Sequence, residues 1–484
     1  MKNTQVLIIG SGMGALVAGA MLTKKGLKTT VLEQNYLPGG CTSAYWRKGF
    51  VFETGATTLV GLGNGMPLQC VLDETGIELN ARRLDLPMRV HLSNGLVCAR
   101  FEDRERWIKE AERVFGAKGQ RQFWEECYRV SDFVWETSLK QQSFPPNNLS
   151  DLIEAVKNAS LKQVKYLPHV FKTVESVVNR YGLHTNKAFV DFVNEQLLIS
   201  AQNHMGEVNF MFGAAALCYT NLPNYYIDGG LINLVQPFVD YIESNGGEVN
   251  LREGVRSVVK NDGGYEVESS TAVYQTEFLI SGIPINNTLE YFPEIKPKFE
   301  QQLMSSDQLN SAFQLGIGFK PHRSFDTIHH QIHLSSPLEG IGAKSIFISL
   351  NHPADLSRTD DEGLAVMSVS THWQNPAYLT YDTDKLTDAV IDVLVEKDFL
   401  KRENIVYQHS SGPKSWQKWT GRKWGFVGGY PQFNHIKPWQ MLGARLDGHK
   451  AYQVGDTVYP GQGIPGVTLS GIIAAKKLLR DWSL

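Results

Sequence analysis

The chain opens with an apolar run, a glycine turn and a second apolar run. Residues 6–9 are all apolar, residues 10–14 hold three glycines, and residues 15–22 are small or apolar throughout. Such runs are typical of elements buried on both faces, and a glycine turn between them favours a strand that leads into a helix. A second apolar strand over 29–32 ends at Glu33. The pattern therefore predicts a parallel, Rossmann-type α/β beginning.

The residues in the turn fit a dinucleotide site. Gly10 allows the tight turn, Gly12 lets the backbone approach a pyrophosphate, and Ala15, after Gly14, lies where helix and strand pack closely. Glu33 follows Gly10 by 23 residues, a spacing at which a carboxylate accepts hydrogen bonds from both ribose hydroxyls and disfavours a 2′-phosphate. The alternative is a merely tight strand–helix turn.

Composition narrows the class of protein. The 484 residues are 42% hydrophobic and 20% charged, with a formal net charge of −3, which excludes a disordered or nucleic-acid-coating chain. The five cysteines are scattered and lack C-x-x-C spacing, so we expect neither a disulfide framework nor a thiolate metal site, and a reducing compartment. We expect no export signal and no membrane span.

A second glycine pair distinguishes an FAD-binding protein from an NAD-binding one. Gly39 and Gly40 precede Cys41-Thr42-Ser43, and a further strand-like segment covers residues 49–55. This arrangement resembles the glutathione-reductase-like FAD family, which includes amine oxidases and carotenoid desaturases. The resemblance implies that the loop runs beside the pyrophosphate and the dimethylbenzene side of FAD. Taken alone, the pair could also be a glycine turn between two hairpin strands.

The third glycine cluster, residues 452–471, carries the closest resemblance. It is similar to the C-terminal flavin motif of the carotenoid desaturase and carotenoid isomerase family, with retinol saturase as a more distant relative. The resemblance implies that Asp456, after Gly455, hydrogen-bonds the ribityl or pyrophosphate part of FAD. It also implies that a helix opened by Gly466, Val467 and Thr468 turns its positive end toward the flavin, where it stabilises the anionic reduced form. The alternative is a Gly/Pro loop that caps a last helix.

The resemblance also implies a discontinuous FAD-binding domain, built from residues 1–70, 222–290 and 420–484, with Val255 against the adenine. Alternating strand patterns predict a mixed-sheet substrate domain over 71–104 and 291–419. Helical periodicity predicts a helical insertion, or cap, over 105–221. The expected fold class is therefore α/β, with a glutathione-reductase-like FAD-binding domain, a substrate domain and a helical insertion.

One face of the helical insertion has two interpretations. Val170, Val174, Val177, Val178 and Tyr181 repeat at helical spacing. Accompanying lysines are Lys157, Lys162, Lys165 and Lys172. An apolar face with lysines suits a membrane surface, where a lipid-soluble substrate is collected. The alternative is that the face packs on its own domain.

Aromatic residues gather just ahead of the third glycine cluster. Seven lie in residues 416–439: Trp416, Trp419, Trp424, Phe426, Tyr430, Phe433 and Trp439. They are interpreted either as an apolar wall for a long conjugated substrate or as ordinary core residues. Within the family, the segment 420–432 is similar to the carotenoid 3,4-desaturase branch.

No acid–base catalyst emerges from the sequence, and the catalytic residues stay unassigned. His329, His330 and His333 form the densest histidine cluster, but on a strand only His329 and His333 share a face, so we expect no metal. A flavin that performs the chemistry itself fits this lack of catalytic groups.

The sequence and its resemblance therefore predict an FAD-dependent desaturase that takes a hydride and a proton from a carotenoid-like polyene. A carotenoid isomerase or retinol-saturase-like enzyme, a flavin amine oxidase, and a non-redox prenyl-binding escort protein are the alternatives. The expected partners are an apolar polyene and an electron acceptor, either oxygen or a quinone, without nucleic acid. The expected location is the cytoplasm, with possible peripheral contact to the inner face of the membrane.

Overall fold

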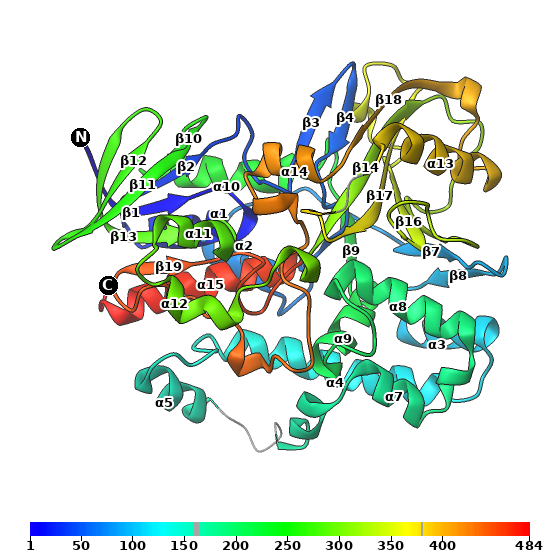
Figure 1. Ribbon diagram of the computed structural model, residues 1–484, viewed down its shortest axis with the longest axis horizontal. Coiled ribbons are helices and arrows are strands. Elements are labelled where there is room, and N and C mark those ends of the chain that lie inside the picture. The colour runs from blue at the N-terminus through cyan, green and yellow to red at the C-terminus, as the bar shows by residue number, and fades with distance from the viewer. Residues whose placement is uncertain (159–163, 379–380) are drawn as a thin grey trace.

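The computed structural model describes residues 1–158, 164–378 and 381–484. Figure 1 shows two sheets side by side, with the helical insertion below the second sheet and beneath the last helix. Lys162 lies outside the described residues. The expected α/β class with a mixed second sheet is confirmed.

The first sheet has seven strands in the order β10-β2-β1-β13-β12-β11, with β19 also paired to β13. The parallel strands are β1 (Lys2–Ile9), β2 (Thr29–Glu33), β10 (Glu248–Leu251), β13 (Val273–Ser281) and β19 (Ala451–Gln453). The antiparallel strands β11 (Val255–Asn261) and β12 (Gly264–Ser269) complete it. Three distant parts of the chain thus meet in one sheet.

Three helices pack together against the first sheet: α1 (Met13–Lys24), α10 (Ile232–Ser244) and α15 (Ile464–Asp481). Residues 13–23 of α1 are all buried, so the helix is covered on every side. Small residues make this close packing feasible. A Cβ added to Gly471 of α15 would lie 2.5 Å from the carbonyl oxygen of Gly14, a distance at which the helices could not stay in place.

The second sheet has seven strands in the order β18-β14-β17-β16-β15-β7-β8. Its strands are β7 (Met88–His91), β8 (Val97–Arg100), β14 (Asn310–Phe319), β15 (His329–His333), β16 (Ser345–Leu350), β17 (Ala365–Gln374) and β18 (Ile405–Ser411). All its pairs are antiparallel except β15 with β7, which makes the sheet mixed. Helix α13 (Thr383–Glu396) contributes Leu386, Val390 and Leu394 to the same core.

Short elements connect the two sheets. They are β3 (Ala44–Arg47), β4 (Phe50–Glu53), β5 (Leu59–Val60), α2 (Pro67–Thr75), β6 (Arg82–Arg83), β9 (Asn224–Tyr226), α11 (Ile285–Tyr291), α12 (Lys296–Phe299) and α14 (Pro413–Thr420). A buried ion pair links β4 to the 3₁₀ turn Leu356–Arg358 that precedes β17, because Arg358 donates to Glu53 over 2.7 Å. Glu53 also accepts a hydrogen bond from the backbone of Leu231, so one carboxylate ties the strand β4 to the start of α10.

The helical insertion has its own aromatic core. Its elements are α3 (Arg104–Phe115), α4 (Gln120–Lys140), α5 (Leu149–Lys157), the 3₁₀ turns Leu167–Phe171 and Leu183–Thr185, α7 (Val174–Arg180), α8 (Lys187–Ala201) and α9 (Phe210–Leu217). Trp107 and Trp124 are fully buried there, with ring centroids 5.0 Å apart. Among the described residues, no helix is long and apolar enough to span a membrane.

The membrane interpretation of residues 170–178 is wrong. Val170 is 5% exposed, and Val174, Val177 and Val178 are fully buried in the core of the insertion. The helical conformation is interrupted at Lys172, between a 3₁₀ turn and α7. These valines therefore do not form one continuous helical face. The alternative interpretation, packing on their own domain, is confirmed.

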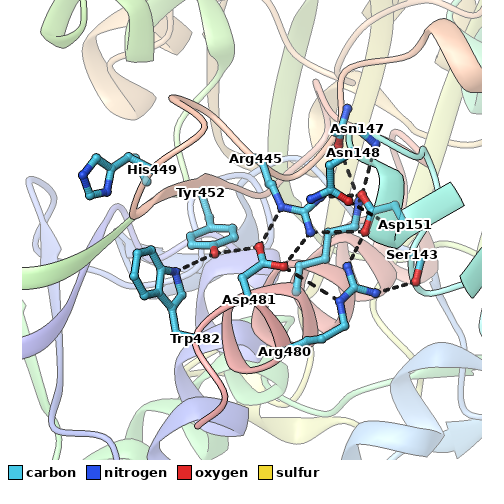
Figure 2. Close-up of polar contacts among 12 residues, drawn as sticks. Ser143, Asn147, Asn148, Asp151, Arg445, His449, Tyr452, Arg480, Asp481 and Trp482 are labelled. Atoms are coloured by element: carbon cyan, nitrogen blue, oxygen red, sulfur yellow. Dashed lines mark hydrogen bonds and ion pairs between the residues drawn. The ribbon is translucent and has the colours of Figure 1, made fainter. Parts of the chain in front are cut away.

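Helix α5 is attached to the body of the protein by a buried carboxylate (Figure 2). Asp151 has no exposed surface and accepts hydrogen bonds from Arg445, Lys477 and Arg480. Arg445 also donates to Asp481 at the end of α15 over 2.7 Å. Helix α5 is thus fixed to the last helix by these ion pairs.

Candidate functional site

The first glycine turn leaves open space where α1 begins. Gly10 has φ +84°, a left-handed conformation that favours glycine, and Gly12 caps α1 without any side-chain hydrogen bond. A Cβ added to Gly12 would have its nearest neighbour 3.8 Å away, whereas one added to Gly14 would lie 2.8 Å from the carbonyl oxygen of Val467. The free N–H groups at the start of α1 therefore face an open approach, and Gly14 serves the contact with α15.

Ala15 lies at a close contact between α1 and the first sheet. A Cβ added to Gly282, just after β13, would lie 2.7 Å from the Cβ of Ala15. The close contact at this position is therefore between α1 and the carboxyl end of β13, one strand over from β1.

Glu33 ends β2 and holds the turn in place. Its Oε2 accepts hydrogen bonds from the backbone N–H of Ser11 over 2.8 Å and from the Ser11 hydroxyl over 2.7 Å. Its Oε1 accepts one from the backbone of Asn35 over 2.8 Å. A carboxylate oxygen has two acceptor positions, so Oε1 keeps one for a ribose hydroxyl.

Val255 is the first residue of β11 and follows a short segment that is hydrogen-bonded to the end of β2. Just before it, the backbone of Glu253 donates to the carbonyl of Glu33 over 2.8 Å, and that of Arg252 donates to the carbonyl of Asn35 over 2.8 Å. The half-buried Val255 thus follows, by two residues, a direct backbone contact with Glu33, the residue expected to bind the ribose.

The second glycine pair lies against the first turn. The N–H of Gly39 donates to the carbonyl of Ser11 over 3.0 Å, and Gly39 pairs with Gly12 in a parallel bridge. Gly39 has φ +96°, and a Cβ there would lie 2.1 Å from the carbonyl oxygen of Thr42. Gly40 has φ +59° and open space around it. The two glycine loops therefore lie in contact with each other.

The third glycine cluster, residues 452–471, lies next to the first glycine turn, because Gly14 is close to Gly455 and Val467. The N–H of Gly455 donates to the Ser470 hydroxyl over 3.0 Å, so the loop is tied to α15. This helix begins at Ile464, two residues before Gly466, which corrects the expected start. Gly466 and Val467 lie in its first turn, and Thr468 follows with its hydroxyl buried and without a partner.

Asp456 has a partner that sequence analysis missed. The guanidinium of Arg422 lies 2.8 Å from its carboxylate, and both side chains are about 15% exposed. The thiol of Cys41 lies close by, and burial raises its pKa, against the opposing charge of Arg422. Arg422 lies in the segment 420–432, but nothing in the sequence pattern places it beside Asp456, and the fold brings the two side chains together.

These residues fit FAD. Several buried polar atoms without a partner belong to the segments around the glycine loops and Asp456: Ser43 Oγ, Arg422 Nη1, Thr468 Oγ1, and the side-chain amide of Gln462. Buried polar groups are rarely left unpaired, so these atoms indicate a polar ligand. Open backbone at Gly12 and Gly40 provides room for it.

A cavity of about 700 Å³ adjoins this region. Its wall comes from the loop after Gly40, the helical insertion, the second sheet and the start of α15; examples are Thr57, Phe212, Phe347 and Ile464. Of the described residues that line it, only Asp456 carries a full charge at neutral pH, and that charge pairs with Arg422. Sequence analysis did not indicate this ion pair.

The aromatic segment divides between the two interpretations. Trp416 and Trp439 line the cavity. Phe426 and Tyr430 are buried in a core cluster of the first sheet, Trp424 and Phe433 pack against that cluster, and Trp419 contacts Tyr36 edge to face. The cavity-wall interpretation therefore holds for two of the seven residues.

The histidines are held by ordinary hydrogen bonds. His329 contacts the Ser349 hydroxyl over 2.9 Å, and His330 donates to the carbonyl of Thr327 over 3.0 Å. In the described part of the chain, no group of three or more histidine, cysteine or acidic residues is placed to hold a metal. His372 lines the cavity beside Gln202, and burial lowers its pKa to about 4, so its imidazole is neutral at pH 7.

The comparison with protein families identifies the class. The model of the flavin-containing amine oxidoreductases matches residues 16–479, and the chain belongs to this family. The protein is an FAD-dependent oxidoreductase, as the glycine loops indicate.

Curated relatives define the group within this class. The chain is 23% identical to prolycopene isomerase 2 of an Oncidium hybrid cultivar, over 99% of this chain and 84% of the relative. It is also 23% identical to a 4,4′-diapophytoene desaturase of Methylomonas, over 98% and 95%. All-trans-retinol 13,14-reductase of Danio rerio is 23% identical over 66% of this chain and 54% of the relative. The resemblance to the carotenoid desaturase and isomerase family is confirmed; the 3,4-desaturase branch stays a prediction.

Solved structures support the fold. An oxidoreductase from Methanosarcina mazei has a TM-score of 0.65 at 14% identity and covers 98% of this chain and 100% of its own. Cyclohexylamine oxidase from Brevibacterium oxydans has a TM-score of 0.63 at 13% identity, covering 99% and 100%.

Proposed function

We propose that the protein desaturates a carotenoid-like polyene by hydride transfer to FAD. The observation that carries this proposal is the cavity of about 700 Å³ next to Asp456, whose described lining is apolar or uncharged elsewhere. A long hydrocarbon has no charges by which it can be fixed, so shape and apolar contact must position it. When bound, FAD would supply the redox chemistry as the hydride acceptor, with oxygen or a quinone as the final electron acceptor.

The chain's own residues hold the cofactor and shape the site. Gly10, Gly12, Gly14, Ala15, Gly39 and Gly40 form the pyrophosphate side, with Glu33 and Val255 at the adenosine end. Gly455, Asp456, Gly466, Val467 and Thr468 form the flavin side. Apolar residues such as Phe212 and Phe347 exclude water and orient the polyene. No residue is assigned as the base that accepts the proton released from the polyene.

The domain assignment belongs to this proposal. Residues 1–70, 222–290 and 420–484 form the FAD-binding domain, 71–104 and 291–419 the substrate domain, and 105–221 the helical cap. Support comes from strand order, because β1, β13 and β19 share the first sheet while β7 joins the second.

An isomerase or a retinol-saturase-like enzyme would use the same cavity. Both activities appear among the names of relatives, and both need an apolar site beside a flavin. They differ from a desaturase in net electron flow: isomerisation leaves the flavin unchanged over the cycle, whereas saturation reoxidises a reduced flavin.

Amine oxidation is the second candidate function. The family description and the fold of cyclohexylamine oxidase favour it. An ammonium substrate is best held by a free anion, and the charged group in the described cavity wall, Asp456, is already paired with Arg422. A prenyl-binding escort protein would need no flavin, so a flavin spectrum of the purified protein would exclude that alternative.

The test mixes the purified holoprotein anaerobically with vesicles that contain 4,4′-diapophytoene or prolycopene. Desaturation predicts loss of oxidised-flavin absorbance together with a polyene of longer conjugation. A changed geometry of prolycopene without net oxidation indicates an isomerase. If both pigments and the flavin spectrum stay unchanged while an amine such as cyclohexylamine reduces the flavin, the proposal is wrong.

We also propose peripheral contact with the inner face of a cytoplasmic membrane. Helix α5 presents its apolar residues outward: Leu149, Leu152, Ile153 and Val156 are 72%, 50%, 48% and 66% exposed. Its fully buried residue is Asp151, so the orientation is the reverse of an ordinary packed helix. The charge contacts in Figure 2 hold this orientation.

Further exposed apolar residues lie at the cavity. Leu167 and Trp439 both line the cavity and are 52% and 47% exposed, so the cavity opens at them. Phe171, at 62% exposure, lies beside Trp439, and Lys437 lies 5.1 Å from the centroid of its ring. Apolar residues beside a lysine suit an anionic lipid surface, from which a polyene would enter directly.

Vesicle flotation tests this contact. We expect the double variant Leu152→Gln/Val156→Gln to bind phosphatidylglycerol vesicles more weakly than the parent protein. Val259→Gln is the matched control, because Val259 is 57% exposed on β11 of the first sheet. Equal flotation of all three proteins, or none by the parent, would exclude membrane contact through α5.

A further inference from the structure

Arg422 is a buried cation with an unsatisfied donor. Its Nη2 lies 2.8 Å from Asp456, but its Nη1 is buried and has no hydrogen-bond partner. A guanidinium has five N–H donors and no acceptor, and a buried charged donor without a partner is costly. The arrangement is therefore complete only when another acceptor lies beside Nη1.

The position of Arg422 indicates which acceptor that is. Its neighbours Asp456 and Cys41 belong to the two loops expected on either side of the cofactor. Its chain neighbour Gly421 lies against Gln34, directly after Glu33. The side chain thus extends from the ribose acid toward the flavin loops, across the span that a pyrophosphate links.

Charge supports the same assignment. A pyrophosphate carries two negative charges, and the loop after Gly39 and Gly40 offers only Cys41, Thr42 and Ser43. The N-terminus of α1 provides partial positive charge, but no full one. An arginine matches phosphate oxygens in geometry and in charge, and it stays protonated when buried.

We infer that Arg422 binds the FAD pyrophosphate, with Nη1 donating to a phosphate oxygen while Nη2 is held by Asp456. Asp456 then acts in part as the residue that orients this arginine. The inference rests on the proposed placement of FAD between the first glycine turn and Asp456, and it does not depend on the substrate.

Ligand titration of the full-length apoprotein tests this role. We expect Arg422→Gln to weaken FAD binding by about ten- to a hundredfold, the range of a charge-assisted hydrogen bond. ADP carries the pyrophosphate without the flavin, so its affinity should fall by a similar factor. Lys423→Gln removes the next cation along the chain, which is half-exposed and pairs with Glu290, and should leave both affinities unchanged.

A double variant separates contact from charge balance. If Arg422 only neutralises Asp456, adding Arg422→Gln to Asp456→Asn will cause no further loss of ADP affinity. We expect a further loss, and Arg422→Lys should recover part of it. Unchanged ADP binding in Arg422→Gln would overturn the inference, even if FAD binding weakens, because the contact would then be to the flavin side. Thermal unfolding of each apoprotein shows whether it is folded.

Discussion

At the scale of single residues, Gly12 and Gly14 meet different constraints. Gly12→Ala should leave the stability of the apoprotein unchanged, because the added Cβ finds no atom closer than 3.8 Å and φ is an ordinary −59°. It should still weaken FAD binding, because the methyl group occupies the approach of the pyrophosphate. Gly14→Ala should cost about 1–3 kcal/mol of stability, since its Cβ would lie 2.8 Å from Val467 O. Thermal unfolding and FAD titration measure the two effects; full FAD affinity in Gly12→Ala would place the pyrophosphate elsewhere.

Glu33 has both a structural and a binding role. Glu33→Ala should weaken FAD binding by about ten- to a hundredfold, because a charge-assisted bond to ribose is lost. It should also destabilise the apoprotein, because the N–H groups of Ser11 and Asn35 lose their acceptor. Ser11→Ala, which removes only the hydroxyl, is the control. Fluorescence titration with FAD gives the affinity, and an unchanged value would exclude Glu33 from the ribose site.

Residues within one local motif could be predicted from sequence, and Arg422 could not. The turn at Gly10 and the acid at Glu33 are fixed by neighbouring strand and helix patterns, so their spacing carries the information. Arg422 and Asp456 are 34 positions apart in the sequence and form an ion pair. The hydrophobic periodicity of the segment between them does not predict this contact. The same limit applies to Gly14, whose contact with α15 depends on how two distant helices pack.

At the scale of elements, Asp151 fixes α5 to α15. Asp151→Asn should destabilise the protein by about 3–5 kcal/mol, because Lys477 would keep a buried charge without its counterion and Arg445 would keep only Asp481. Burial acts to raise the pKa of Asp151, but hydrogen bonds from Arg445 and Asn147 and the charge of Lys477 outweigh it and lower the pKa to about 2. Its contribution is therefore complete above the ordinary carboxyl pKa and is lost as the pH falls toward 2. Denaturant unfolding compares it with Asp132→Asn, an exposed partner of Arg104; equal small losses would contradict this role.

Helix α5 and the valines after Pro168 show why element-level prediction succeeded only in part. Helical periodicity located the insertion, but periodicity does not tell whether an apolar face points inward or outward. The valines at 174, 177 and 178 pack inward, while Leu149 and Val156 point outward because Asp151 is drawn into a cluster of cations. The cations come from residues 445–480, so the orientation of α5 is decided by the other end of the chain.

At the scale of the whole molecule, buried histidines predict sensitivity to acid. Burial lowers the pKa of His91, His329, His333, His372 and His409 to about 4, and that of His330 to about 3. Unfolding restores the ordinary value near 6.5, so the unfolded chain binds more protons between pH 4 and 6.5. Stability should therefore rise steeply with pH across this window and level off above it. Thermal unfolding from pH 4 to 8 measures the rise; a flat profile below pH 6.5 would contradict it.

The cavity wall is built from several parts of the chain. Substituting two phenylalanines, one in the cavity wall and one in the core, distinguishes an effect on substrate binding from an effect on stability. Phe212 lines the cavity, whereas Phe192 is fully buried in the helical insertion and is absent from the described cavity wall. Phe192→Ala should cost about 3–5 kcal/mol of stability without changing the products. Phe212→Ala should cost less, because part of its ring already borders open space, but it should slow turnover or shift the product pattern with FAD content unchanged. Chromatography of the polyene products, at a temperature where both variants are folded, makes the comparison. If Phe192→Ala alters the products while Phe212→Ala does not, the polyene does not lie in this cavity.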